Sequence, residues 1–138
     1  MFKVSRQVEY ALIALKHMSD TGAEQVTAVR ELCRVHHLPF DVISRALQRL
    51  AKHGVLKSVR GIGGGYRVVG DLGLVSLLDL VAIVDGGLEL VPCVSETPSC
   101  KCDNLDGCSI QPSMVSLNDR LGGFFKTISV LELLEGKN

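Results

Sequence analysis

The chain has 138 residues, of which 46% are apolar and 22% are charged, and its formal net charge is 0. This length is enough for one modest hydrophobic core, and the high apolar content excludes an intrinsically disordered chain. The apolar run over residues 72–84 is too short to span a bilayer and is interrupted by Ser76 and Asp79. Glu9 lies within the one stretch that resembles a signal peptide. We therefore expect a soluble, cytoplasmic protein.

The charge is distributed unevenly along the chain. Residues 30–67 contain eight basic and two acidic side chains, a net charge of +6, and residues 68–138 contain four basic and ten acidic ones, a net charge of −6. In the first 29 residues the basic and acidic side chains are equal in number. A basic segment joined to an acidic one is expected when only the first contacts nucleic-acid phosphates.

Helical periodicity begins close to the N-terminus. Ser5 is a candidate N-cap for a first helix, in which apolar residues recur at helical spacing. A second helix is expected to begin at Thr27 as its N-cap. It should direct Leu32 and Val35 inward and end at the turn over residues 36–39.

A third helix is expected over residues 40–53, ending at Gly54 in a left-handed cap. Its apolar residues share one face, and its polar and basic residues share the other. The outer face consists of Ser44, Arg45, Gln48, Arg49 and Lys52. Two helices joined by a tight turn, the second with a basic outer face, indicate a helix-turn-helix.

Two short β-prone segments follow, over residues 55–60 and 66–69, separated by a glycine-rich tip. A basic helix face alone is often only solvated, but here a basic hairpin adjoins it, and this pairing is typical of a winged helix that binds duplex DNA. Ser44, Arg45 and Gln48 are the candidate base readers, while Arg49, Lys52, Lys57 and Arg67 suit phosphates. The complete predicted contact set is Ser44, Arg45, Gln48, Arg49, Lys52, Lys57, Ser58, Arg60, Gly63, Tyr66 and Arg67.

The acidic half of the chain predicts two further helices and a loop. Ser76 and Asp79 resemble a capping box that opens a helix ending near Gly86. After an irregular loop, apolar residues recur in alternating steps of four and three, the seam of a helix that packs lengthwise on another helix. The seam consists of Ile110, Met114, Leu117, Leu121, Phe124, Ile128 and Leu131. Gly122-Gly123 interrupts this pattern, and Ser129 with Glu132 is a candidate cap for a separate last turn.

Four of the five cysteines fall within sixteen consecutive positions: Cys93, Cys100, Cys102 and Cys108. The cytosol keeps thiols reduced, which disfavours a disulfide framework, so the cluster points to metal or redox chemistry. The spacing is a poor zinc pattern, a thiol switch needs only two of these residues, and an iron-sulfur cluster needs several thiolates from a flexible loop. The fifth, Cys33, is interpreted as a core residue of the helix-turn-helix.

The segments over residues 9–12, 47–56 and 58–66, together with the cysteine loop, closely resemble the family of winged-helix regulators that includes IscR and NsrR. The segment Arg60-Gly-Ile-Gly-Gly-Gly-Tyr66 is highly specific in that context, and the resemblance covers essentially the whole chain. It implies a homodimer built by helices after the loop, a [2Fe-2S] or [4Fe-4S] cluster near the dimer interface, and gene regulation that changes with the state of the cluster.

The resemblance also implies a ligand set, with Cys93, Cys102 and Cys108 as cluster ligands. Two residues compete for the fourth position. Cys100 is an extra thiol, and Glu9 stands one place before Tyr-Ala, where the NsrR type carries an aspartate that reaches the partner's cluster. No histidine follows Cys108, unlike in the IscR type, and Ser44 replaces a base-reading glutamate, so the target sequence does not transfer.

We therefore predict a mainly α fold, a winged helix-turn-helix with a long C-terminal dimerisation helix. The predicted units are a DNA-binding domain over 1–70, a connecting helix over 71–90, a cluster-binding loop over 91–109, and a dimerisation helix with a last turn over 110–138. The predicted function is a non-enzymatic transcription regulator, a repressor or an activator, whose DNA affinity is controlled by an iron-sulfur cluster that senses nitric oxide, redox state, or iron and cluster status. The alternative is a metal-free regulator that senses oxidants through its thiols.

Overall fold

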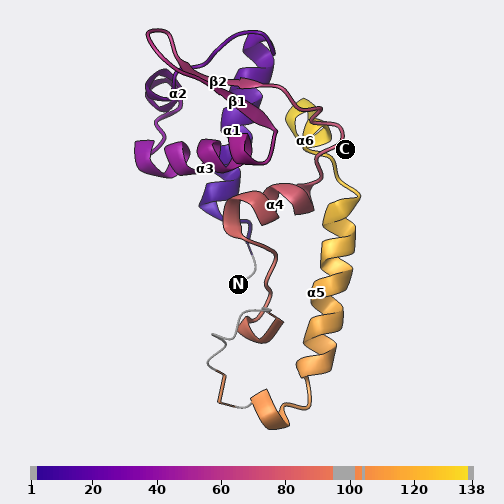
Figure 1. The fold of residues 1–138 in the computed structure, drawn as a ribbon. Coiled ribbons are helices and arrows are strands. Elements are labelled where there is room, and N and C mark those ends of the chain that lie inside the picture. The colour runs from indigo at the N-terminus through magenta and orange to yellow at the C-terminus, as the bar shows by residue number, and fades with distance from the viewer. Residues whose placement is uncertain (1–2, 95–101, 104, 137–138) are drawn as a thin grey trace.

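The computed structural model describes residues 3–94, 102–103 and 105–136, and shows a mostly helical chain with one two-stranded sheet (Figure 1). The predicted fold class is confirmed. The elements are α1 (Arg6–Thr21), α2 (Val29–His36), α3 (Phe40–Lys52), β1 (Leu56–Val59), β2 (Gly65–Val68), α4 (Leu77–Asp85), the 3-10 turns η1 (Pro92–Val94) and η2 (Leu105–Gly107), α5 (Gln111–Lys126) and α6 (Val130–Glu135).

The first helix forms as its sequence predicts. Ser5 is in an extended conformation, and its hydroxyl accepts a hydrogen bond from the Val8 N–H at 3.2 Å, which satisfies one of the unpaired donors of the first turn. The apolar face of α1 packs on α3 and α4 around a continuous core. That core includes Val8, Ala11, Leu15 and Met18 from α1, Ile43, Leu47 and Leu50 from α3, and Leu80 and Val84 from α4.

The prediction for the start of α2 is wrong. The N-cap is Ala28, and Thr27 is instead buried in a two-residue bridge to Tyr66. The Thr27 N–H donates to the Tyr66 carbonyl at 2.8 Å, and the Tyr66 N–H donates to the Thr27 carbonyl at 2.9 Å. Leu32 is fully buried as expected, but Val35 is 44% exposed, so the expectation that Val35 points inward is wrong.

The sheet is an antiparallel hairpin in which Leu56 pairs with Val68 and Val59 pairs with Gly65. Its tip is a hydrogen-bonded turn, in which the Gly64 N–H donates to the Gly61 carbonyl at 3.0 Å. Gly65 has a positive φ of 154°, and a Cβ atom there would lie 2.0 Å from the Thr27 carbonyl oxygen. Only glycine therefore allows the wing to approach the start of α2 so closely.

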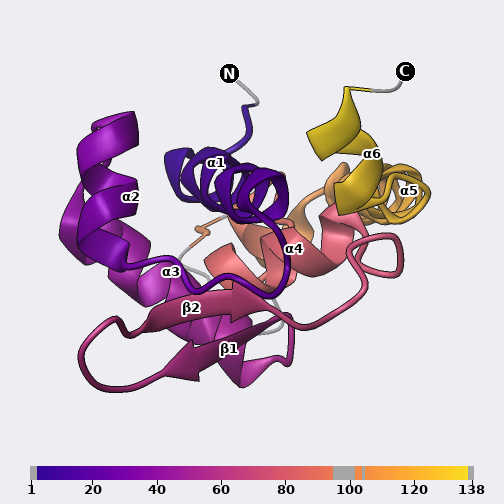
Figure 2. The ribbon, with the colours of Figure 1, turned by 90° about the horizontal axis from the view of Figure 1, so that it is seen from above.

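Both predicted capping boxes are present. Ser76 and Asp79 exchange side-chain hydrogen bonds with each other's backbone at the start of α4, and Ser129 and Glu132 do the same at the start of α6. Ser76 and Ser129 also form a bridge, so α6 returns to the winged-helix core (Figure 2). The last helix is thus part of the N-terminal unit in space.

The seam predicted over residues 110–131 is divided between two helices. Ile110 is the N-cap of α5, which ends at Lys126, and Leu131 belongs to α6. The Gly122-Gly123 pair does not interrupt α5, because Gly122 is buried against Leu78 of α4 and the helix continues through it. Within the described residues, every helix is too short or too polar to cross a membrane.

Candidate nucleic-acid interface and cysteine loop

The outer face of α3 carries the predicted base readers. Arg45, Gln48 and Lys52 are exposed, and Ser44 is half-buried. They lie opposite the fully buried Ile43, Leu47 and Leu50, whose packing fixes the rotation of the helix about its axis. The face is therefore presented to solvent on a rigid support, which is the arrangement that base recognition in a major groove requires.

Arg49 differs from its neighbours on α3. Although it is exposed, its guanidinium Nη1 donates a hydrogen bond to the carbonyl oxygen of Val84, in the last turn of α4. The sequence suggested a phosphate contact for this side chain, and the helical pattern of α3 alone gave no signal for a partner on another element.

The hairpin supplies a second basic element beside α3, which packs against β1. Lys57, Ser58 and Arg60 are exposed, and Gly63 lies in the exposed tip with a φ of 77°. Tyr66 and Arg67 are half-buried at the base of β2. In Figure 2 the hairpin and α3 lie on one side of the molecule, and α5 and α6 lie on the other.

Arg67 is not a free cation. Its Nη1 lies 4.0 Å from Glu24 Oε2 in the segment between α1 and α2, and its side chain is 29% exposed. A pair at this distance on the protein surface is weak, so Arg67 is able to exchange Glu24 for a phosphate. The carboxylate of Glu24 also places a negative charge beside β2.

The cysteine loop runs between α4 and α5. Cys93 lies in η1 and is half-buried, Cys102 is exposed, and Cys108 is half-buried. Cys108 follows η2 and lines an open hollow of about 450 Å³, together with Asp103, Gly107 and Ser109. Cys93, Cys102, Cys108 and Cys33 are free thiols, and Cys100 lies outside the described residues.

The described start of the loop is attached to α5. η1 packs on α5, and the Leu90 N–H donates to Asn118 Oδ1 at 3.0 Å. This contact holds the segment before Cys93 against the middle of α5. Sequence reasoning missed Asn118, because a polar residue on a helix gives no local sign of a partner in a distant loop.

Among the described residues, the predicted ligands do not form a metal-binding group. Over residues 3–94, 102–103 and 105–136, no three His, Cys, Asp or Glu side chains lie close enough to hold a metal ion. Glu9 is on the first turn of α1, where its carboxylate lies 3.7 Å from the Arg6 guanidinium and its side chain is 50% exposed.

Cys33 behaves differently from the loop cysteines. It lies in α2, partly buried against the core of the helix-turn-helix. Burial raises the pKa of the Cys33 thiol, because the apolar surroundings disfavour the charged thiolate. This environment supports its interpretation as a packing residue.

The outer surface of α5 is unusually apolar. Ile110, Leu117 and Phe124 are all about half exposed or more, at 58%, 48% and 60%. They lie seven residues apart, on the seam predicted from the sequence. Single exposed apolar residues are common on soluble proteins, whereas a row of three along one helix forms an apolar surface patch.

Comparison with known proteins identifies the family. A family model described as Rrf2, an iron-dependent transcriptional regulator, matches residues 4–136. The chain belongs to the Rrf2 family. This Rrf2 protein is 24% identical over 135 residues to the HTH-type transcriptional regulator IscR of Cronobacter sakazakii. The alignment covers 98% of this chain and 82% of that relative.

Solved structures share the fold. CymR (YrzC), the global cysteine regulator of B. subtilis, aligns with a TM-score of 0.70 at 17% identity over 100% of both chains. IscR of T. potens aligns with a TM-score of 0.67 at 19% identity, over 99% of this chain and 89% of that one. The predicted family and the prediction that the chain is not an enzyme are confirmed, and the Rrf2 protein is a transcriptional regulator.

Proposed function

We propose that this Rrf2 protein is a homodimeric regulator that binds duplex DNA through α3 and the β1–β2 wing, and whose cysteine loop holds an iron-sulfur cluster that controls the affinity. The single observation that carries the DNA-binding part is the adjacency of two basic, exposed elements on one buried scaffold. The helix suits the major groove, and the hairpin suits the backbone or the minor groove.

Dimerisation along α5 is supported by the row of Ile110, Leu117 and Phe124. A second copy fits this row better than a different protein does, because an apolar helix face repeated by symmetry matches itself across a two-fold axis. A dimer would also present two copies of α3 to successive turns of the major groove.

The donor chemistry of the loop suits a cluster. Iron-sulfur clusters are held by cysteine thiolates, and Cys93, Cys102 and Cys108 are free thiols, none of them fully buried. When bound, such a group supplies an oxidisable and labile centre that responds to a redox or small-molecule signal. Glu9 would complete the set from the partner protomer, and Cys100 is the alternative fourth ligand.

The same three free thiols also support the second candidate, a metal-free thiol sensor. They are not gathered in this structure, and a thiol sensor needs only two of them to meet on oxidation. The two functions differ in a direct observable, because only the cluster gives a coloured protein that contains iron and sulfide.

The cluster is tested by anaerobic purification of the full chain, followed by an absorption spectrum and by iron and sulfide analysis. Cys93→Ala, Cys102→Ala and Cys108→Ala are each expected to remove the colour, and Cys100→Ala is the matched control that keeps it. Glu9→Ala is expected to keep a less stable cluster. A colourless Cys100→Ala protein beside an unaffected Glu9→Ala protein would make the site all-cysteine, and a colourless wild type would favour the thiol sensor.

The dimer is tested by analytical sedimentation of Leu117→Asp against Ser116→Asp. Leu117 lies on the apolar row, and Ser116 is an exposed neighbour on α5. A carboxylate at 117 would be buried against the partner without a counter-charge. We expect the first variant to sediment as a monomer or aggregate and the second as a dimer, and a dimeric Leu117→Asp protein would remove α5 from the interface.

A further inference from the structure

The contact between Arg49 and Val84 joins two elements with different roles. Arg49 lies on α3, the helix that the proposed function directs to DNA, and Val84 lies in the last turn of α4, thirty-five positions later. The chain continues from α4 into the cysteine loop. One nitrogen of the exposed Arg49 guanidinium is therefore engaged by the protein itself, whereas the exposed Lys52 on the same helix is available to a phosphate.

The chemistry of a helix end explains this contact. The last carbonyl oxygens of a helix have no partner within it, and together they carry a partial negative charge. In α4 the Gly86 N–H donates to the Ala82 carbonyl at 3.1 Å, which leaves the Val84 carbonyl to other donors. The last turn of α4, all of it within the described part of the chain, has Asp85 and no basic residue. Arg49 thus supplies from α3 the positive charge that α4 lacks.

The backbone that follows α4 is suited to bending. Gly86 and Gly87 have φ values of 89° and 144°, and both are free of neighbours around the position of a Cβ atom. Beyond them, Leu90 is tied to Asn118 of α5 and leads directly into η1, which contains Cys93. Only a short segment, which contains the glycine pair, therefore separates Val84, the partner of Arg49, from Cys93.

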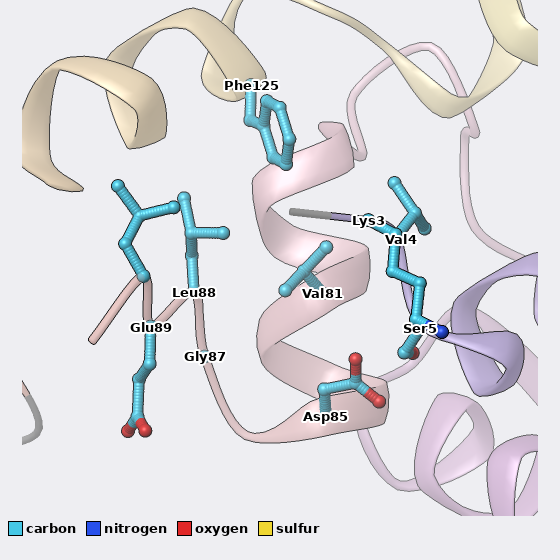
Figure 3. A pocket seen from close by; sticks show the side chains of 10 residues that line it. Lys3, Val4, Ser5, Val81, Asp85, Gly87, Leu88, Glu89 and Phe125 are labelled. Carbon is cyan, nitrogen blue, oxygen red and sulfur yellow. The ribbon is translucent and has the colours of Figure 1, made fainter. Parts of the chain in front are cut away.

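There is also space for movement beside this segment. A cavity of about 350 Å³ lies between residues 3–5, α4, Phe125 and the 87–90 segment (Figure 3). Asp85 lines this cavity and also a second hollow of about 270 Å³, which Arg45 and Arg49 line as well. The end of α4 is consequently bordered by open volume on two sides.

We propose that Arg49 is a positioning residue, a latch that couples the state of the cysteine loop to the position of the Arg45 side chain on the outer face of α3, and not a phosphate contact. The proposal rests on the proposed function, because it needs α3 to bind DNA and the loop to respond to a signal. A change in the loop that displaces the end of α4 moves the Val84 carbonyl. The guanidinium then shifts within the hollow that Arg49 and Arg45 both line, and the Arg45 side chain takes a different position toward the DNA.

The first test is hydrogen exchange on the free full-length protein, comparing Arg49→Gln with Lys52→Gln. Both variants remove one positive charge from the last part of α3, and only the first removes the contact to α4. We expect the hydrogen-bonded amides of Gly86 and Leu90 to exchange about tenfold faster in Arg49→Gln and at the wild-type rate in Lys52→Gln. Arg49→Lys, which keeps a charged donor, should restore slow exchange and shows that the loss is not general unfolding.

The second test is the salt dependence of duplex binding. Each lost phosphate contact reduces the slope of log K against log salt by about 0.9, and a homodimer loses one contact in each protomer, so the expected reduction is about 1.8. We expect that reduction for Lys52→Gln only, while Arg49→Gln binds more weakly at an unchanged slope. Arg49→Gln should also lose the wild-type difference in affinity between protein with free and with alkylated loop thiols.

Two outcomes would separate the latch from the proposed function. If the wild type fails to bind duplex DNA, the proposed function is wrong, and the exchange experiment still decides the contact to α4. If the wild type binds and Arg49→Gln shows a reduced slope with normal exchange at Gly86 and Leu90, Arg49 is a phosphate contact and the latch is refuted.

Discussion

Gly65→Ala tests how the wing is fixed to the helix-turn-helix. The added Cβ atom would lie 2.0 Å from the Thr27 carbonyl oxygen and 2.9 Å from the Ala28 Cα atom. Both contacts are with backbone, so no side chain can rotate away to make room. The substitution must therefore separate β2 from Thr27 and break the two hydrogen bonds between Thr27 and Tyr66.

The loss of folding free energy in Gly65→Ala follows from the two broken backbone hydrogen bonds. Each backbone hydrogen bond contributes about 1 kcal/mol, and a group left buried without a partner costs about 1–3 kcal/mol. Thr27 is only 5% exposed, so its groups are not readily rehydrated. We expect Gly65→Ala to lower the free energy of unfolding by about 3 kcal/mol. The matched control is Gly63→Ala, where φ is 77° but nothing lies within 4 Å, and the expected cost is the left-handed backbone alone, about 1–2 kcal/mol.

Urea unfolding measures both free energies, and binding of a duplex by the same proteins reports the position of the wing. Gly65→Ala should weaken binding even under conditions where it remains folded, because the basic hairpin is no longer fixed at the start of α2. If Gly65→Ala costs no more than Gly63→Ala and binds DNA normally, the bridge between Thr27 and Tyr66 does not position the wing.

Two further outcomes follow from the surface and from the buried thiol. Arg45→Ala should lose about 1–3 kcal/mol of binding free energy on a specific duplex and relax base preference, whereas Lys52→Ala should weaken the binding of specific and random duplexes equally. If each variant lost the same affinity on both duplexes, the assignment of Arg45 as a base reader would be wrong. Because burial raises the pKa of the Cys33 thiol, less of it is thiolate at neutral pH, so iodoacetamide should alkylate Cys33 more slowly than the exposed Cys102. Mass spectrometry of the two peptides during labelling measures this order, and faster labelling of Cys33 would show that its site is open.

Features that depend on neighbouring residues were predictable from the sequence. The caps at Ser5, Ser76 and Ser129 are local, since each serine hydroxyl accepts from a backbone N–H three residues later. The same local logic failed at Thr27, whose sequence position suits an N-cap equally well. The hydrogen-bond partner of Thr27 is Tyr66, and a bridge between residues far apart in the chain leaves no periodic pattern in the sequence.

The functional side chains divide in the same way. The basic face of α3 follows from helical spacing, so the sequence alone was enough to place Arg45, Gln48 and Lys52 on it. The role of Arg49 was not predictable in this way, because its partner is a backbone carbonyl in another helix. Every residue has such a carbonyl, and only the packing of α3 on α4 selects the one at Val84. The arrangement of the cysteine loop was equally out of reach, because an irregular loop has no period from which to infer direction.

The glycine pair in α5 shows how packing changes the meaning of a sequence signal. Two glycines in a helix cost about 1 kcal/mol each relative to alanine, which favours a break. The helix persists because Gly122 and the adjacent Phe125 are buried, the former against Leu78 of α4. α5 instead ends at Lys126, and α6 returns to the core through the bridge between Ser76 and Ser129. The C-terminal end of α5 is thereby anchored to the winged helix, so any tilt of α5 moves most at its opposite end, which begins at Gln111, shortly after Cys108.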